Sequence, residues 1–285
     1  MLEITSIFSI GVAKENAAWE ASADKTNTLL DAESVEEYIC SGDSLAPQQY
    51  EKLLKYLPTG TLNILDVGCG AGQSSVYLAN HGHHVWALEP NYRFCNIIEK
   101  AANKYSLSIV SCHGVAEDIN KINQTFDVIF FNASLHHCDD PMQALMHCYD
   151  SLKHNGMIFL VNENFIRPWM TKARFHHLME TQPEAMGNYG GNEHTFYNWQ
   201  YVNMLRISNF KKIRTIQPTR ITALERIEFI LARRMHGRRI HSTGMSILLR
   251  LIFYILEEKI RGIHWLSTLL QRSSIFACHF SARKL

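Results

Sequence analysis

One stretch decides the fold of this chain: Asn63-Ile64-Leu65-Asp66-Val67-Gly68-Cys69-Gly70-Ala71-Gly72-Gln73-Ser74-Ser75. Its first five residues form a short apolar run of the kind that a buried parallel strand shows. Glycines follow at alternate positions, and a helical pattern begins at Ser74. A strand, a glycine turn and a helix in this order form a ligand crevice at the carboxyl end of the strand, since glycine lets a ligand lie against bare backbone.

The spacing of the glycines narrows the choice of ligand. A dinucleotide fingerprint requires Gly-x-Gly-x-x-Gly/Ala, but here the third glycine comes one place early and Gln73 stands at the dinucleotide position. Gln73 therefore disfavours the alternative of a nicotinamide-dependent dehydrogenase. The Asp-x-Gly-x-Gly-x-Gly pattern resembles the first motif of class I S-adenosylmethionine (SAM)-dependent methyltransferases. The resemblance implies that SAM is bound by Asp66, Gly68, Cys69, Gly70 and Gly72.

Composition sets the broad class. The chain has 285 residues, of which 46% are hydrophobic, so it can bury a full core as one domain with embellishments. The net charge of +1 gives no general attraction to nucleic acid. The seven cysteines are scattered without a Cys-x-x-Cys pair, which favours a reducing compartment and argues against a zinc site or a disulfide framework. With no signal-peptide pattern and no long apolar run, we expect a cytoplasmic protein. We expect no metal, because no set of Asp, Glu and His residues has clear ligand spacing.

Two further stretches extend the resemblance. His84 to Leu88 reads as a second strand that ends at Glu89, where the family places an acid whose carboxylate accepts hydrogen bonds from a ribose diol. The run His113 to Ile119 resembles the family's Gly-Asp-Ala-Glu-Asp-Leu loop, which holds adenine. Val115 replaces the usual aspartate, so either Glu117 or the backbone of Ala116 would supply that contact.

A third stretch places the reacting end of the cofactor. Residues 125–132 read as another strand, and 133–141 as its exit loop, which resembles the family's phrase Leu-x-His-x-x-Asp-Pro. The resemblance puts Asn132 under the sulfonium and adenine. Farther along, Asn155 and Asn209 stand where the family has glycine, and asparagine can adopt the positive φ that these turns need.

Strands that alternate with helices imply right-handed crossovers. We therefore expect an α/β, Rossmann-like, doubly wound and mostly parallel sheet of seven strands. The expected parts are an N-terminal helical cap over 1–57, a SAM-binding core over 58–218, a helical insert over 219–272 and the last strand of the core within 273–285.

Methyl transfer is an in-line displacement, in which the enzyme supplies mainly proximity and orientation. An oxygen acceptor also needs a base, for which histidine is the usual side chain. His136 and His137 leave the strand that ends at Asn132, and His194 lies in the expected lid. Glu163, at the end of the strand over 157–161, is a rival that could instead hydrogen-bond a sugar or an amine. Each of the three histidines could also be a simple packing or surface residue.

The insert has an uneven charge. Residues 211–250 hold ten Lys or Arg and two Glu, a local charge of +8. This pattern fits a helical hairpin with a solvated basic rim, or a dock for an anionic membrane surface or a lipid-linked acceptor. We expect a SAM-dependent methyltransferase acting on oxygen or nitrogen of a small molecule, such as a sugar or a lipid-linked precursor. The alternative is a non-catalytic SAM-fold protein that binds a partner or a membrane through this insert.

Overall fold

The computed structural model of the chain describes residues 1–20, 28–40, 47–181, 194–216, 252, 255, 263–272 and 278–285. The strands are β1 (Leu2–Glu3), β2 (Asn63–Val67), β3 (His84–Glu89), β4 (Ile109–His113), β5 (Phe126–Asn132), β6 (Leu152–Glu163), β7 (Lys211–Thr215) and β8 (Cys278–Arg283). The α-helices are α1 (Ile10–Glu20), α3 (Val35–Cys40), α4 (Pro47–Leu54), α5 (Gln73–Asn80), α6 (Tyr92–Lys104), α7 (Pro141–Ser151), α8 (Lys172–Thr181), α10 (Asn198–Ile207) and α13 (His264–Arg272). Short 3₁₀ helices are η1 (Thr28–Asp31), η2 (Ala116–Ile122) and η3 (Leu135–His137).

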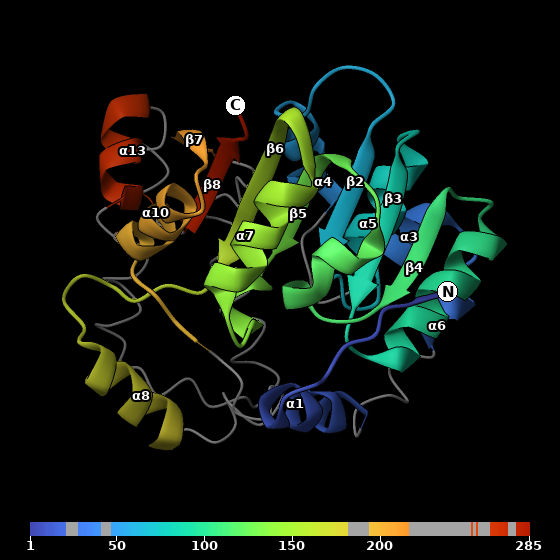
Figure 1. The fold of residues 1–285 in the computed structure, drawn as a ribbon, viewed down its shortest axis with the longest axis horizontal. Coiled ribbons are helices and arrows are strands. Elements are labelled where there is room, and N and C mark those ends of the chain that lie inside the picture. The colour runs from blue at the N-terminus through green and yellow to red at the C-terminus, as the bar shows by residue number, and fades with distance from the viewer. Residues whose placement is uncertain are drawn as a thin grey trace.

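The strands form a single sheet in the order β1-β4-β3-β2-β5-β6-β8-β7, in which β8 runs antiparallel to both of its neighbours and the other pairs are parallel (Figure 1). This confirms the doubly wound, mostly parallel sheet but corrects the strand count from seven to eight. The additional strand is β1, which pairs with Cys112 and His113 at the sheet edge. Two residues are too few to show an alternating pattern, so this strand could not be predicted from the sequence.

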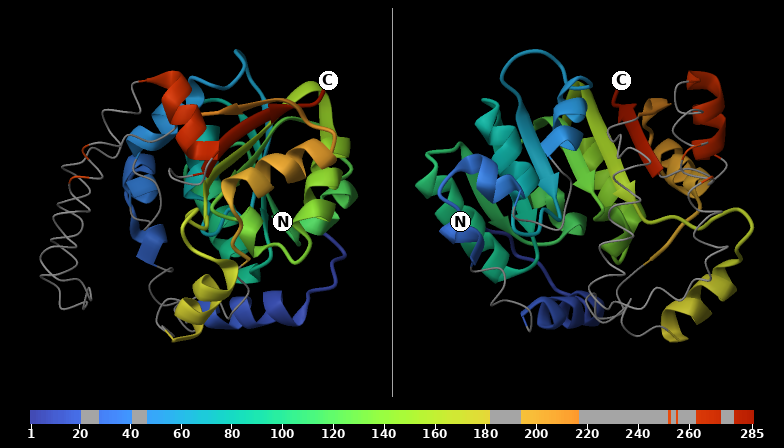
Figure 2. Two further views of the ribbon diagram at one scale, coloured as in Figure 1. Left: turned by 90° about the vertical axis from the view of Figure 1, so that its left-hand side faces the viewer. Right: turned by 180° about the vertical axis from the view of Figure 1, so that it is seen from behind.

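Successive residues of the central strands face opposite layers of the core. Leu65, Ile129 and Ile158 pack on the side of α7 and α10, whereas Ile64, Val128 and Phe159 pack on the side of α4 and α5. The two helical layers are seen from the front and from behind in Figures 1 and 2. Because both faces are covered, the strands are almost wholly apolar, as the run over 63–67 predicted.

The carboxyl ends of β2, β3, β5 and β6 lie at one edge of the sheet. The chain leaves β2 toward β3 and β4 and then returns to β5 on the other side, so the strand order reverses between β2 and β5. Such a reversal opens a crevice for ligands. Helix α1 lies across this edge (Figure 1), where the side chain of Asn16 donates to the carbonyl of Pro90 over 3.0 Å.

Two predicted turns are confirmed by backbone angles. Asn155 has a φ of 62° and Asn209 a φ of 67°, so both take the left-handed conformation expected of them. The expected cap over 1–57 contributes β1 as well as helices. Most of the insert over 219–272 lies outside the described residues, and α13 is its described end. Among the helices that the structure describes, none is long and apolar enough to cross a membrane. Membrane contact through 219–272 and a cytoplasmic location stay predictions.

Candidate functional site

The glycine turn after β2 has two kinds of glycine. A Cβ atom on Gly68 would lie 2.6 Å from Cβ of Ser134, and one on Gly72 would lie 2.7 Å from Cγ1 of Ile98. These two positions therefore need glycine for internal packing. A Cβ atom on Gly70, which has a φ of 56°, would meet no atom of the described residues within 4 Å. Gly70 thus borders open space beside the strand end, where a ligand can approach the backbone.

Asp66 lies fully buried beneath this turn. Its Oδ2 accepts hydrogen bonds of 2.6 Å from the hydroxyls of both Ser74 and Ser75, in the first turn of α5. Its Oδ1 is buried and has no hydrogen-bond partner among the described residues. Burial raises the pKa of Asp66 to about 6, although the two serine hydroxyls lower it. Oδ1 of Asp66 can therefore accept a hydrogen bond from a donor outside the described residues.

Glu89 ties the end of β3 to the same turn. Its Oε2 accepts from the amide of Gly70 over 2.8 Å, and its Oε1 accepts from the amide of Asn91 over 3.0 Å. Burial raises the pKa of Glu89 to about 7. Each oxygen of a carboxylate has two acceptor positions, so Glu89 can accept two further hydrogen bonds.

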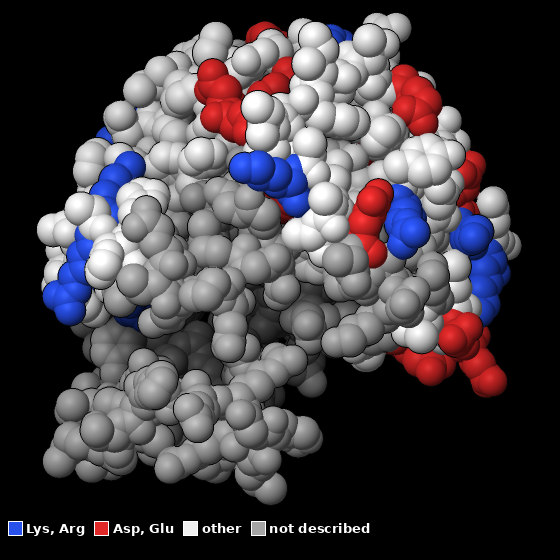
Figure 3. All heavy atoms as spheres, turned by 90° about the horizontal axis from the view of Figure 1, so that it is seen from below, with Lys and Arg blue, Asp and Glu red and all other residues white. Residues whose placement is uncertain are grey.

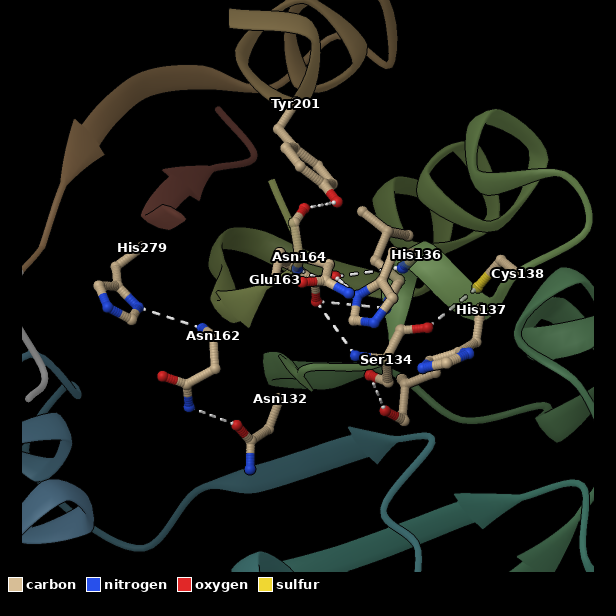
Figure 4. A network of polar contacts seen from close by, with 12 residues as sticks. Asn132, Ser134, His136, His137, Cys138, Asn162, Glu163, Asn164, Tyr201 and His279 are labelled. Carbon is tan, nitrogen blue, oxygen red and sulfur yellow. Dashed lines mark hydrogen bonds and ion pairs between the residues drawn. The ribbon is translucent and has the colours of Figure 1, made fainter. Parts of the chain in front are cut away.

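The other predicted cofactor residues surround this crevice. Ala116 and Glu117 begin η2 just after β4. Oε1 of Glu117 accepts from the amide of Asp140 over 2.9 Å, and burial raises the pKa of Glu117. Asn132, at the end of β5, accepts from the side-chain amide of Asn162 over 2.7 Å (Figure 4). Burial raises the pKa of the Cys69 thiol, so this residue contributes a neutral side chain.

Glu163, at the end of β6, holds the loop that leaves β5. Its Oε1 accepts from the amides of Ser134 and Leu135, both over 3.2 Å. Its Oε2 accepts from the amide of His136 over 3.1 Å and also lies 2.6 Å from Nδ1 of that residue (Figure 4). These contacts take all four acceptor positions of the carboxylate, which is 2% exposed. In this arrangement Glu163 fixes the loop over 134–136.

The three predicted histidines lie together beside the crevice. The rings of His136 and His137 are 4.2 Å apart. His194 is exposed, and its amide donates to the carbonyl of His136 over 2.8 Å. His136 is buried, whereas the side chain of His137 is 17% exposed and its Nδ1 lies 3.4 Å from Oε1 of Glu15 in α1. The fold therefore brings all four predicted catalytic candidates to one place.

Some residues of the site were not predicted from the sequence. Glu15 and Tyr38 come from the N-terminal helices, and the hydroxyl of Tyr38 donates to the carbonyl of Ala71 over 2.5 Å. Ser134 donates to the carbonyl of Val67 over 2.6 Å and so joins the ends of β2 and β5. Ser74 and Ser75 were not predicted either, although the sequence held a signal for them. Two hydroxyls in the first turn of a helix can reach an acid at the end of the preceding strand.

Figure 3 looks at this end of the molecule, where the described acidic and basic side chains are scattered over the surface. Within the part of the chain that the structure describes, no group of three or more His, Cys, Asp or Glu side chains could hold a metal ion. The expectation of a site without a metal stays a prediction.

The known proteins to which this chain is similar include methyltransferases. A family model described as a methyltransferase domain matches residues 65–160. A protein of Actinobacillus pleuropneumoniae serotype 5b (strain L20), named ubiquinone biosynthesis O-methyltransferase, is 33% identical over 107 residues, which are 35% of this chain and 45% of that protein. A protein of the same name from Coxiella burnetii is 28% identical over 130 residues, 45% of this chain and 55% of that protein. The chain thus spans about half the length of these relatives.

Among solved structures, the fold resembles that of phosphoethanolamine N-methyltransferase 2 of Haemonchus contortus in complex with S-adenosyl-L-methionine. The TM-score is 0.54 at 15% sequence identity, and the match covers 98% of this chain and 60% of that one. At this identity the similarity concerns the fold, which is that of a methyltransferase core.

Proposed function

Since this chain belongs to the class I SAM-dependent methyltransferases, we propose that it moves a methyl group from SAM to a small molecule. The observation that carries the proposal is the glycine turn itself, in which Oδ1 of Asp66 has no partner among the described residues and Gly70 borders open space. We propose oxygen as the methylated atom because two relatives are named O-methyltransferases. Nitrogen is the alternative.

The residues at the crevice fit SAM. Oδ1 of Asp66 would accept from the ammonium group of the methionine part, which offers the donor that this oxygen lacks. Glu89 would accept from the two ribose hydroxyls at its remaining acceptor positions. The backbone of Ala116 is the better candidate for adenine, because the carboxylate of Glu117 already accepts from Asp140. When bound, SAM supplies a methyl group on a positively charged sulfur.

We assign the acceptor side of the reaction to the loop after β5. His137 is the proposed base, since it is the more exposed histidine of the pair and its Nδ1 faces a carboxylate. Glu15 would fix the ring so that Nε2 takes the proton of an acceptor hydroxyl. The positioning role belongs to Glu163, which holds His136 and the loop that carries His137. His194, whose amide donates to the carbonyl of His136, would lie next to the acceptor.

Calorimetric titration with SAM tests the cofactor, with NADH as the competing compound. We expect SAM to bind and NADH not to displace it. Incubation with labelled SAM and fractionated metabolites, followed by mass spectrometry, then identifies the acceptor. If SAM does not bind, or if NADH displaces it, the proposal is wrong. A protein that binds SAM but methylates nothing would instead match the non-catalytic alternative, for which the named relatives give no support.

The base is tested with His137→Asn and Glu15→Gln. We expect His137→Asn to lower kcat at least tenfold and to remove the acidic limb of the pH–rate profile, with SAM affinity unchanged. Glu15→Gln should move that limb without removing it. The matched control is His154→Asn, because His154 is exposed and lies at the start of β6, away from the crevice. A normal pH profile in His137→Asn would contradict the assignment.

A further inference from the structure

A second cavity lies away from the crevice. Its volume is about 690 Å³, within the range of small-molecule pockets. It is lined by the chain after α4, the start of the parallel part of β6, strands β7 and β8, and helix α13. Among its described lining residues, five are basic and none is a carboxylate: Lys55, Lys212, Arg214, Arg272 and Arg283.

The position of this cavity separates it from the cofactor crevice. Met157, in its wall, pairs with Arg283, which in turn pairs with Lys211 at the start of β7. These residues lie at the edge of the sheet where the parallel strands begin. The glycine turn, Glu89 and Glu163 lie at the opposite edge, where those strands end. The cavity is therefore a site of its own.

No described carboxylate neutralises the positive charges in this cavity. Among the described residues, none of the five forms an ion pair. Two guanidinium groups are held in place by carbonyls, with Arg272 donating to Ile213 and Arg283 to Asn155, both over 3.3 Å. Each guanidinium has five N–H groups, so both retain donors for a ligand. Like charges that converge without a counter-ion repel one another, and a bound anion relieves that repulsion.

The backbone of β7 is distorted at the cavity. The register between β7 and β8 shifts between the pairs Lys211–Arg283 and Arg214–Ser281, so β7 contains one extra residue. Lys212 has a φ of 48°, a conformation that a lysine rarely adopts. Bulges and strained residues occur preferentially at functional sites, where they direct a side chain to a ligand. Here the distorted segment presents both Lys212 and Arg214 to the cavity.

We propose that this cavity binds a ligand with at least two negative charges on phosphate groups. Arginine forks match the geometry of phosphate oxygens, and the lysines add charge without a fixed direction. Ser281 and Thr268 place hydroxyls in the wall, and Met157 and Ile216 provide an apolar part that accommodates the organic portion of a phosphate ester. The same chemistry fits a soluble phosphorylated compound and the head group of an anionic lipid.

The test uses the full chain and two double variants of equal charge. Lys55→Gln/Arg214→Gln removes two cavity cations that have no hydrogen bond or ion pair among the described residues. Lys100→Gln/Arg206→Gln is the control, because both residues are exposed and neither lines the cavity. Sodium pyrophosphate is titrated into each protein by calorimetry, and SAM is titrated separately to show that each variant is folded.

We expect pyrophosphate to bind the wild-type protein and the control equally, and the cavity variant at least tenfold more weakly. In a second arm, sedimentation with phosphatidylglycerol vesicles and with phosphatidylcholine vesicles distinguishes the sources. Binding to phosphatidylglycerol alone that the cavity variant loses would support a lipid head group, and pyrophosphate binding without vesicle binding would support a soluble ligand. The proposal is overturned if the wild-type protein binds neither probe, or if the cavity variant binds as well as the control.

Discussion

Nδ1 of His136 and Oε2 of Glu163 share a hydrogen bond of 2.6 Å between the loop after β5 and the end of β6. The same carboxylate accepts three consecutive backbone amides of that loop. One buried side chain from the neighbouring strand therefore fixes the path of the segment that carries the histidine pair. The loop is anchored where the acceptor would be oriented, and effective proximity depends on such positioning.

Replacing Glu163 should destabilise the fold strongly. Glu163→Ala leaves three buried amides and one imidazole without their acceptor, so we expect a loss of about 3–5 kcal/mol in the free energy of unfolding. Glu163→Gln, which keeps one acceptor oxygen, should lose less. Urea unfolding followed by circular dichroism measures both values, with the exposed Asp150→Asn as control. Equal stability of Glu163→Ala and the wild type would show that the carboxylate does not hold the loop.

Asp66→Asn should weaken SAM binding without unfolding the protein. The amide can still accept from the serine hydroxyls, but it loses the charge that would hold an ammonium group. Hydrogen bonds to charged groups contribute about 1.5–3 kcal/mol, so we expect roughly a 10- to 150-fold rise in Kd. Calorimetry measures it, and Ser74→Ala should give a smaller effect. An unchanged Kd would exclude Asp66 as the ammonium partner.

Substitutions of Gly68 and Gly70 should distinguish the role of the turn in internal packing from its role in ligand binding. Gly68→Ala places a Cβ atom 2.6 Å from Ser134, so we expect it to lower stability by about 1–3 kcal/mol more than Gly70→Ala does. Gly70→Ala carries only the strain of a positive φ, about 1–2 kcal/mol. It should nevertheless lose SAM affinity, because its methyl group enters the open space. Thermal unfolding and SAM titration of both variants decide this, and a Gly70→Ala protein with normal affinity would place the ligand elsewhere.

SAM affinity should depend on pH through Glu89. Its pKa of about 7 in the folded protein means that the carboxylate, which accepts two ribose hydrogen bonds most strongly when ionised, becomes protonated below neutrality. We expect Kd to rise by up to about tenfold for each pH unit below about 7. In Glu89→Gln the affinity should be weak and nearly independent of pH between 6 and 8, apart from the effect of Asp66. Titrations across that range test the prediction, which a flat wild-type profile would contradict.

The raised pKa of Glu89 also predicts how the stability of the protein without SAM changes with pH. Between its ordinary pKa of 4.5 and the folded value of about 7, the folded protein binds the proton and the unfolded chain does not. The contribution of Glu89 to stability is therefore present at low pH and is lost as pH rises through 7. The stability difference between the wild type and Glu89→Gln should fall by on the order of 2–3 kcal/mol from pH 4.5 to pH 8. Urea unfolding at several pH values measures the difference, and a rise would reverse the assignment.

Much of the architecture was predictable because its signals are local. The strand over 63–67 was readable from its apolar run, and the left-handed turns at Asn155 and Asn209 followed from asparagine's tolerance of positive φ. The motif also indicated the cofactor class. It did not indicate that Gly68 faces Ser134 while Gly70 faces open space, because that difference depends on a loop about 65 positions away.

The rest of the site depends on long-range contacts. Glu15 meets His137 only because α1 crosses the carboxyl edge of the sheet, and a glutamate on a short helix carries no sign of this in the sequence. Glu117 matched the adenine loop by position, yet its carboxylate accepts from Asp140 in the following loop. The bulge at Lys212 likewise results from the register of β7 against β8, which the order of residues in one strand does not specify.

The antiparallel strand β8 has a consequence for the order of assembly. It is the last described strand along the chain, yet it lies between β6 and β7, and among the described strands β7 pairs with β8 alone. A ribosome therefore releases β6 with an open hydrogen-bonding edge and β7 without its partner strand until β8 emerges. Pairings that join such distant positions form slowly, and unpaired edges are the surfaces through which nascent chains associate. Completion of the sheet thus waits until β8 has been synthesised.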